Sequence, residues 1–166
     1  MDDDVVMAHS IRSAQLADHP SVIAVVDDWW GGRRMAALLP SLFFEHFGGT
    51  SLIAEDDAGE LAGFLVGFDS PDHPGDAYVH FLGVRPDMRR SALGRALHDQ
   101  FARDAASRGI TKVRCVTSTA NDASVAFHTA IGFQVEGVDA PVEIDGLDDV
   151  VGHVRLVRDL TGGINV

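Results

Sequence analysis

An apolar run, AYVHFLGV at 77–84, is followed within a few residues by an arginine-rich turn, RRSALGRAL at 89–97. The run is typical of a buried strand, and the spacing of Leu93, Leu97 and Phe101 predicts a helix that stops at Gly109. A strand followed so closely by a helix indicates a layered fold in which helices pack on a sheet. The first N–H groups of such a helix lack intrahelical acceptors and sit at the positive end of its dipole, so the turn is suited to an anion.

Strands and helices alternate along the rest of the chain. We expect further strands over 9–14, 51–56, 61–68, 112–118, 133–138 and 151–160. We expect further helices over 20–30, 33–47 and 122–131, with Pro40 kinking or splitting the second. Several strands follow one another directly, so the pattern predicts an α/β fold with a mixed sheet rather than a strictly alternating one. The length of 166 residues predicts a single domain over 1–166.

The charge balance narrows the classes of partner. The net charge is -12, from 25 acidic and 13 basic residues, which argues against nucleic acid and against an anionic membrane surface. There is one cysteine, no apolar span of transmembrane length and no signal-peptide pattern at the start, so we expect a cytoplasmic protein. Against this acidic background, the gathering of Arg85, Arg89, Arg90 and Arg95 stands out.

The arginine-rich turn has two interpretations from its residues alone. Gly94 permits close approach of a phosphate or pyrophosphate, and Arg89, Arg90 and Arg95 can add bidentate contacts. The alternative is an ordinary solvated helix start. No Lys-Ser/Thr pair follows the turn and there is no GxGxxG, which disfavours ATP and dinucleotide binding.

Two motifs give a resemblance to a known family. V-x-P-x-x-R-x-x-A-x-G, from Val84 to Gly94, resembles the acetyl-CoA loop of the GCN5-related N-acetyltransferase (GNAT) superfamily, with pattern R/Q-x-x-G-x-G/A; Ala92 replaces its first glycine. NDASVAFHTAIGF, from Asn121 to Phe133, resembles the later family segment N-x-x-A/S-x-x-F/Y-Y-x-x-x-G-F. The resemblance implies the GNAT-type acyl-CoA N-acyltransferase fold, a central twisted mixed sheet splayed in the middle and flanked by about four helices.

The resemblance also implies where acetyl-CoA, the expected cofactor, would bind. The strand end would pair its backbone with the pantetheine arm, the turn would hold the pyrophosphate, and the later helix would line the thioester end. In order, these residues are Leu82, Gly83 and Val84; Arg89, Arg90, Ser91, Ala92, Leu93, Gly94 and Arg95; and Asn121, Ser124 and Phe127. Three of them have structural alternatives: Asn121 as a helix cap, Ser124 as a first-turn residue and Phe127 as core.

Two histidines occupy the positions that the family resemblance assigns to proton transfer. His80 stands where relatives often place a Glu or His that accepts the amine proton, and imidazole titrates at about 6.5, close to working pH. His128 replaces a tyrosine that acts as general acid in many relatives. Each histidine could instead be a packing residue.

The resemblance implies that the acceptor is an amine of a small molecule or a protein. By the resemblance, the acceptor groove would be bordered by Trp29, Trp30, Arg33, Arg34 and the acidic loop 139–149. The acidic loop favours a cationic amine, whereas the arginines favour an acceptor with a carboxylate or phosphate. The tryptophans could stack on a substrate or belong to the core.

The sequence therefore predicts an acetyl-CoA-dependent N-acetyltransferase acting by direct transfer. The alternative is a non-catalytic acyl-CoA-binding sensor that has lost the tyrosine acid. Cys115 lies in an apolar strand and is predicted to be core rather than a nucleophile. No metal-ligand spacing is present, so no metal is expected. A homodimer is expected from the family resemblance.

Overall fold

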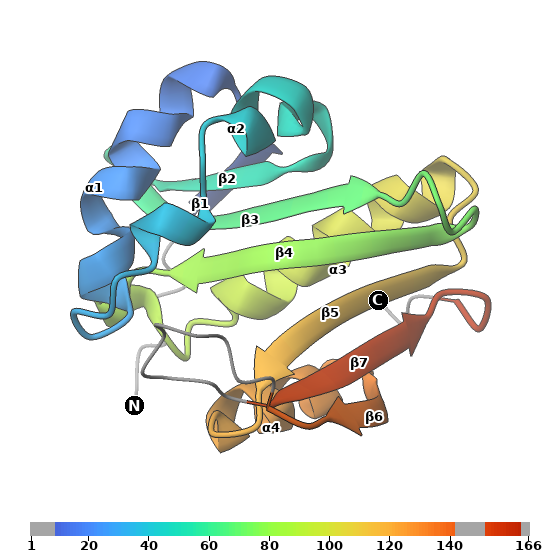
Figure 1. Cartoon of the computed structure of the whole chain (residues 1–166). Helices are drawn as coiled ribbons and strands as arrows, with labels where there is room; N and C mark the ends of the chain where they lie inside the picture. The colour runs from blue at the N-terminus through green and yellow to red at the C-terminus, as the bar shows by residue number, and fades with distance from the viewer. Residues whose placement is uncertain (1–8, 142–151, 164–166) are drawn as a thin grey trace, which may run out of the picture. The chain divides into compact units, whose positions relative to one another are not determined.

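The computed structural model describes residues 9–141 and 152–163, and within them the chain forms a mixed seven-stranded sheet with the strand order β1-β2-β3-β4-β5-β7-β6. The strands are β1 (His9–Ser13), β2 (Leu52–Asp56), β3 (Leu61–Asp69), β4 (Asp76–Val84), β5 (Lys112–Ser118), β6 (Gln134–Asp139) and β7 (His153–Asp159). The α-helices of this described part are α1 (His19–Trp29), α2 (Leu42–His46), α3 (Leu93–Ser107) and α4 (Asp122–Ala130) (Figure 1). The predicted mixed sheet is confirmed.

The chain divides into two compact units, and each is described by itself. The first unit contains the chain up to Phe68 together with Phe81–Asp104, and the second contains Asp69–His80 and the chain from Ala105 onward. Strand β4 and helix α3 each contribute residues to both units. The parallel pairing of β4 with β5 lies in the second unit, where Asp76 is opposite Lys112 and Val79 is opposite Cys115.

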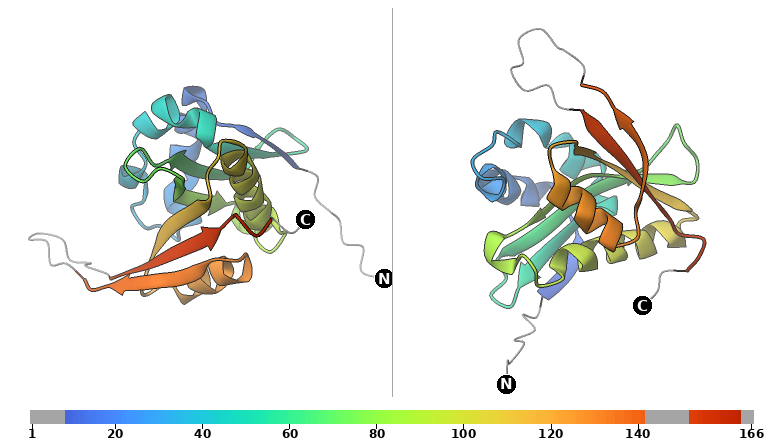
Figure 2. Two further views of the ribbon diagram at one scale, coloured as in Figure 1. Left: turned by 90° about the vertical axis from the view of Figure 1, so that its right-hand side faces the viewer. Right: turned by 90° about the horizontal axis from the view of Figure 1, so that it is seen from below.

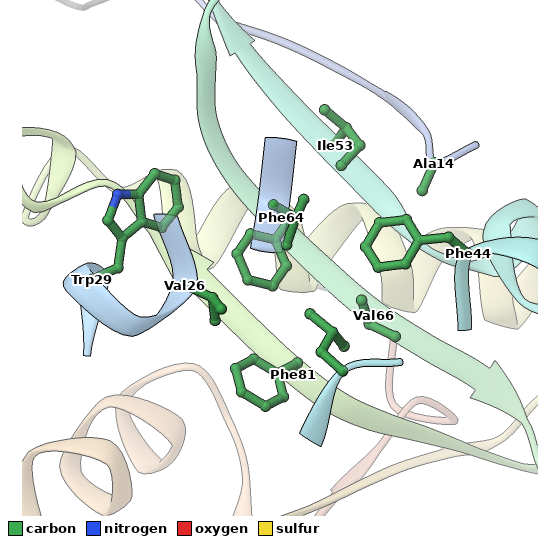
Figure 3. Close-up of a cluster of buried hydrophobic side chains, with 10 residues drawn as sticks. Ala14, Val26, Trp29, Phe44, Ile53, Phe64, Val66 and Phe81 are labelled. Atoms are coloured by element: carbon green, nitrogen blue, oxygen red, sulfur yellow. The ribbon is translucent and has the colours of Figure 1, made fainter. Parts of the chain in front are cut away.

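An aromatic core fills the first unit on the α1 and α2 side of β3. Val22, Val26 and Trp29 recur at helical spacing on α1 and are buried there with Phe64 and Phe81 (Figure 3). The Trp29 and Phe64 rings are stacked with centroids 6.0 Å apart. The apolar stripe of α1 is therefore what attaches this helix to the sheet.

Helix α3 covers the other face of β3. A Cβ atom at Gly63 would lie 3.2 Å from Leu97 and 3.3 Å from Leu93, whereas its neighbour Phe64 points into the α1 core. Successive residues of a strand point to opposite faces, so Phe64 faces α1 and Gly63 faces α3. Strand β3 therefore lies between the two helical layers of this unit (Figure 1).

In the second unit, strands β5, β7 and β6 run side by side as antiparallel neighbours (Figure 2). Arg114 on β5 forms ion pairs with Asp76 of β4, at 2.6 Å, and with Glu136 of β6. This guanidinium holds the pKa of Glu136 below its usual range. One side chain therefore connects three strands by charge.

The expected strands are confirmed, with ends that move by no more than two residues. The predicted split at Pro40 of the helix expected over 33–47 is confirmed, but its extent is wrong: only a 3₁₀ turn, η2 (Ala36–Leu38), and α2 form there. The Asp27 carboxylate accepts hydrogen bonds from the N–H groups of Met35 and Ala36, and this side-chain cap delays the helical turn to Ala36. Most of the acidic 139–149 loop, including Glu143, Asp145, Asp148 and Asp149, lies outside the described residues.

Candidate functional site

The turn between β4 and α3 has an uncommon backbone conformation. Arg90 has a φ of 68° and Ala92 a φ of 64°, in the left-handed region that non-glycine residues seldom occupy. The Ser91 hydroxyl donates to the Met88 carbonyl at 2.5 Å, and the Ala96 N–H donates to the Ala92 carbonyl at 2.9 Å as the helix begins. Both left-handed residues are exposed.

This geometry fits a diphosphate. Alternation between left-handed and other backbone conformations turns successive N–H groups toward one concavity, which binds anions. The first turn of α3 follows directly, with its N–H groups lacking intrahelical acceptors. Ala92, which stands where the family pattern has its first glycine, takes a left-handed conformation that glycine adopts without steric cost.

The arginines of the cluster have different environments. Arg85 donates to Asp56 at 3.0 Å and to Asp87 at 2.7 Å, so its charge is matched within the first unit. Arg89 donates to the backbone carbonyls of Val84, at 3.4 Å, and Trp29, which connects the turn to the end of α1. Within the described residues, the exposed Arg90 side chain makes no hydrogen bond or ion pair, while Arg95 is exposed on the first turn of α3.

The predicted strand-end residues pack closely. A Cβ atom at Gly83 would lie 2.4 Å from the Phe64 ring, so the glycine is required by packing within the unit. Leu93 is buried beside Gly63, which leaves only its backbone for a ligand. Leu82, Val84 and Gly94 are half-buried.

Helix α4, in the second unit, carries the other residues that are predicted to bind the cofactor. The Asn121 side chain accepts a hydrogen bond from the Ser124 N–H at 3.1 Å, so Asn121 is the N-cap of α4. Phe127 is half-buried, and its ring is T-shaped to that of His128 at 5.2 Å. The helix-cap alternative for Asn121 is confirmed by this bond; a cap can also contact a ligand.

His128 is buried on α4 and held in one orientation. Its Nδ1 lies 2.7 Å from the Ser124 carbonyl, and its ring is T-shaped to Phe133 at 5.3 Å. A carbonyl only accepts, so Nδ1 carries the proton. Burial lowers the pKa of His128 from its usual value of 6.5, although the Ser124 carbonyl opposes that shift. The site therefore favours the neutral imidazole at neutral pH.

His80 lies on the half-buried face of β4. Buried and half-buried residues alternate along this strand, which places Tyr78, His80 and Leu82 on one face and Phe81 and Gly83 on the other. Sequence reasoning gave Tyr78 no role, although it is the chain's only tyrosine and stands two positions before His80. Burial raises the pKa of Tyr78, so its phenol stays protonated.

The predicted acceptor residues divide into core and surface. Trp29 is only 7% exposed and stacks on Phe64, which favours the core alternative. Trp30 is partly buried, with its ring 4.9 Å from Phe81. Arg33 and Arg34 are exposed on the segment between α1 and η2, and within the described residues neither guanidinium makes a hydrogen bond or ion pair.

Other chemistry finds little support in the described part of the chain. Burial raises the pKa of Cys115 to about 12, so its thiol stays protonated at neutral pH. Among residues 9–141 and 152–163, no group of three His, Cys, Asp or Glu side chains could hold a metal ion. No helix of the described ranges has both the length and the apolar character to cross a membrane.

The model of the Acetyltransferase (GNAT) family matches residues 10–133, which includes the strand, the left-handed turn and α4. The chain belongs to the GNAT family. Members of this family are acetyl-CoA-dependent N-acetyltransferases. Family membership confirms the prediction made from the motifs at 84–94 and 121–133.

Three proteins illustrate the range of relatives of this GNAT chain. It is 28% identical to the L-2,4-diaminobutyric acid acetyltransferase of Nocardia farcinica, over 73% of this chain and 62% of that protein. It is 27% identical to an L-methionine sulfoximine/L-methionine sulfone acetyltransferase of Pseudomonas aeruginosa, over 79% and 83% of the two chains. The structure of the diaminobutyrate acetyltransferase of Paenibacillus lautus, solved with L-2,4-diaminobutyric acid and coenzyme A, has a TM-score of 0.72 and 19% identity, covering 96% of this chain and 99% of that one. This last likeness shows the fold.

Proposed function

We propose that this protein transfers the acetyl group of acetyl-CoA directly to the amine of a small acceptor that also carries a carboxylate. The observation that carries the proposal is the exposed left-handed turn at Arg90 and Ala92 before α3, in a chain that belongs to the GNAT family. Acetyl-CoA supplies the activated thioester when it is bound. The chain's own residues bind the cofactor and the acceptor, orient them, and accept the proton of the amine.

The turn and the first residues of α3 would hold the diphosphate. Backbone N–H groups from Ala92 to Arg95 supply fixed donors, and the Arg90 guanidinium adds charge from the exposed face. Arg89 bonds to carbonyls, so we assign it to holding the turn rather than to contacting phosphate. Leu82, Gly83 and Val84 would offer backbone groups at the end of β4, while Asn121, Ser124 and Phe127 would contribute from α4.

We assign His80 as the group that accepts the amine proton, directly or through water, because its imidazole lies on the half-buried face of β4. His128 has its proton on Nδ1, where the Ser124 carbonyl accepts it. We propose that His128 acts as a neutral orienting residue of α4 rather than as the acid. The buried thiol of Cys115 supports direct transfer over an acyl-enzyme.

A carboxylate on the acceptor would match Arg33 and Arg34. Both guanidinium groups are exposed, and an arginine fork binds a carboxylate with two parallel hydrogen bonds. The names of the Nocardia farcinica and Pseudomonas aeruginosa relatives describe amino-acid acceptors, which supports the same class here. The matched region spans 62% of the first of these relatives, and substrate choice is part of our proposal.

The test is release of CoA thiol from acetyl-CoA in the presence of matched amines. L-2,4-Diaminobutyrate and L-methionine sulfoximine represent the proposed class, and 1,3-diaminopropane is diaminobutyrate without its carboxylate. We expect kcat/KM for diaminobutyrate to exceed that for diaminopropane by at least about tenfold, and Arg33→Ala with Arg34→Ala to remove most of the difference. Equal turnover of the two diamines would overturn the carboxylate assignment. Binding of CoA without turnover of any amine would favour the sensor.

We further propose that the protein is cytoplasmic and forms a homodimer, as expected from the sequence and the family resemblance. The mass in solution, measured by light scattering, tests the dimer. A monomer at micromolar concentration would exclude it.

A further inference from the structure

We infer that Asp27 is a positioning residue for the acceptor: its carboxylate holds the acceptor loop, defined as residues 30–36, and thereby sets where Arg33 and Arg34 stand. The inference rests on the proposed function of these arginines. Asp27 lies in the last turn of α1, just before the acceptor loop, and is half-buried.

Asp27 accepts hydrogen bonds from both ends of the acceptor loop, through its side chain and through its backbone carbonyl. One carboxylate oxygen, Oδ1, accepts hydrogen bonds from the Met35 N–H at 2.7 Å and the Ala36 N–H at 2.8 Å. The Asp27 carbonyl accepts from the Gly32 N–H at 2.8 Å and the Trp30 N–H at 3.2 Å. The two ends of the acceptor loop are therefore both bonded to one residue.

The conformation of the acceptor loop requires such an anchor. Gly31 and Gly32 have φ values of 70° and 85°, so they reverse the chain directly after α1. Glycine loses more conformational freedom on ordering than any other residue, and two in succession need compensating bonds to hold one conformation. Hydrogen bonds to a carboxylate are stronger than neutral ones, so Asp27 supplies this compensation.

The other anchor of the acceptor loop faces the candidate diphosphate turn. Arg89, within that turn, donates to the Trp29 carbonyl, and the Trp30 ring packs on Phe81. The start of the acceptor loop is thus attached to the turn, and Asp27 fixes its far end. The exposed Arg33 and Arg34 lie between these two anchors. Loss of the Asp27 anchor would therefore leave their position undefined.

Three variants separate this role from a general effect on stability. Asp27→Ala removes the acceptor oxygens, Asp27→Asn keeps one oxygen with a weaker bond, and Asp28→Ala changes the adjacent exposed carboxylate as the matched control. We expect Asp27→Ala to raise KM for diaminobutyrate at least about tenfold, with KM for acetyl-CoA changed less than about twofold, and Asp27→Asn to be intermediate. Asp28→Ala should match the unchanged protein.

A second readout needs no activity. Trypsin cuts after arginine, and release of the acceptor loop should speed cleavage after Arg33 and Arg34 by at least about tenfold in Asp27→Ala but not in Asp28→Ala. Equal cleavage of the two variants overturns the inference. Faster cleavage with unchanged acceptor KM also overturns it, because the loop would then not serve the acceptor. If no amine is turned over by the unchanged protein, the proposed function fails, and the trypsin result alone then decides whether Asp27 holds the acceptor loop. If Asp27→Ala does not fold, Asp27→Asn carries both measurements.

Discussion

His128 shows how one residue's surroundings revise a role predicted from a motif. A tyrosine at this position could donate a proton at neutral pH, because its ordinary pKa is about 10. The histidine is buried, has a lowered pKa and already donates its Nδ1 proton to the Ser124 carbonyl. The sequence position indicated chemistry, whereas the surroundings indicate a neutral, fixed ring.

The lowered pKa predicts a pH dependence of stability. Well above pH 6.5 the ring is neutral in both folded and unfolded chains, so His128 contributes no pH dependence there. As the pH falls below that value, the unfolded chain takes up a proton that the folded chain does not, and the free energy of unfolding decreases. We expect His128→Asn, whose amide can donate to Ser124, to flatten the stability curve between pH 6.5 and 5.

Chemical unfolding at a series of pH values measures this effect. The exposed His153→Asn on β7 is the matched control and should keep the shape of the original curve. A loss of kcat by more than about a hundredfold in His128→Asn at pH 8 would show instead that the ring does act as the acid.

At the scale of elements, the turn that begins α3 stores backbone strain at the candidate diphosphate site. Two non-glycine residues, Arg90 and Ala92, hold left-handed conformations there, and such strain persists only where the surrounding structure imposes it. Here β4 on one side and the buried Leu93 and Leu97 on the other fix both ends of the turn. This strain is consistent with the binding role that we propose for the turn.

Replacement of the strained alanine tests this account. Ala92→Gly removes the steric cost of the left-handed conformation but makes the unfolded chain more flexible, so we expect the free energy of unfolding to rise by up to about 1 kcal/mol. Acetyl-CoA affinity should be kept. Ala96→Gly, inside α3, is the matched control and should lower the same quantity by about 1 kcal/mol. Equal destabilisation by both changes would contradict the left-handed conformation of Ala92.

At the scale of the whole molecule, a strongly acidic chain must bind an anionic cofactor. With a net charge of -12, long-range attraction is absent, and affinity depends on short-range donors in the turn before α3. Arg90, which makes no ion pair among the described residues, is the side chain best placed to add to them.

Ligand-linked stability measures this binding without knowledge of the acceptor. At a hundred times its Kd, a ligand of the folded state adds about 2.7 kcal/mol to the free energy of unfolding. For a chain of this size we expect acetyl-CoA and CoA to raise Tm by about 5 to 10 °C. ATP and NAD should give no rise, and Arg90→Ala should require a higher CoA concentration for the same rise. Stabilisation by ATP equal to that by CoA would mean that the turn recognises phosphate alone.

The sequence by itself determined the strands, helices α1, α3 and α4, and the family. These follow from local signals: apolar periodicity, a glycine-containing turn, and two motifs of fixed spacing. The single domain, the homodimer, the cofactor-binding residues with their diphosphate turn, and His80 as the base stay predictions, and for His128 we propose an orienting role in place of the acid.

Only the tertiary structure decided which side chains already have partners within the protein. Arg85 and Arg89 looked equivalent to Arg90 in sequence, but distant partners such as Asp56 and the Trp29 carbonyl engage them. Trp29 lies in the core, and Asp27 accepts hydrogen bonds from N–H groups eight and nine residues away, at the start of η2 in the segment where a longer helix was expected. Periodicity reports only neighbours along the chain, whereas hydrogen bonds and burial depend on residues that meet only after the chain has folded.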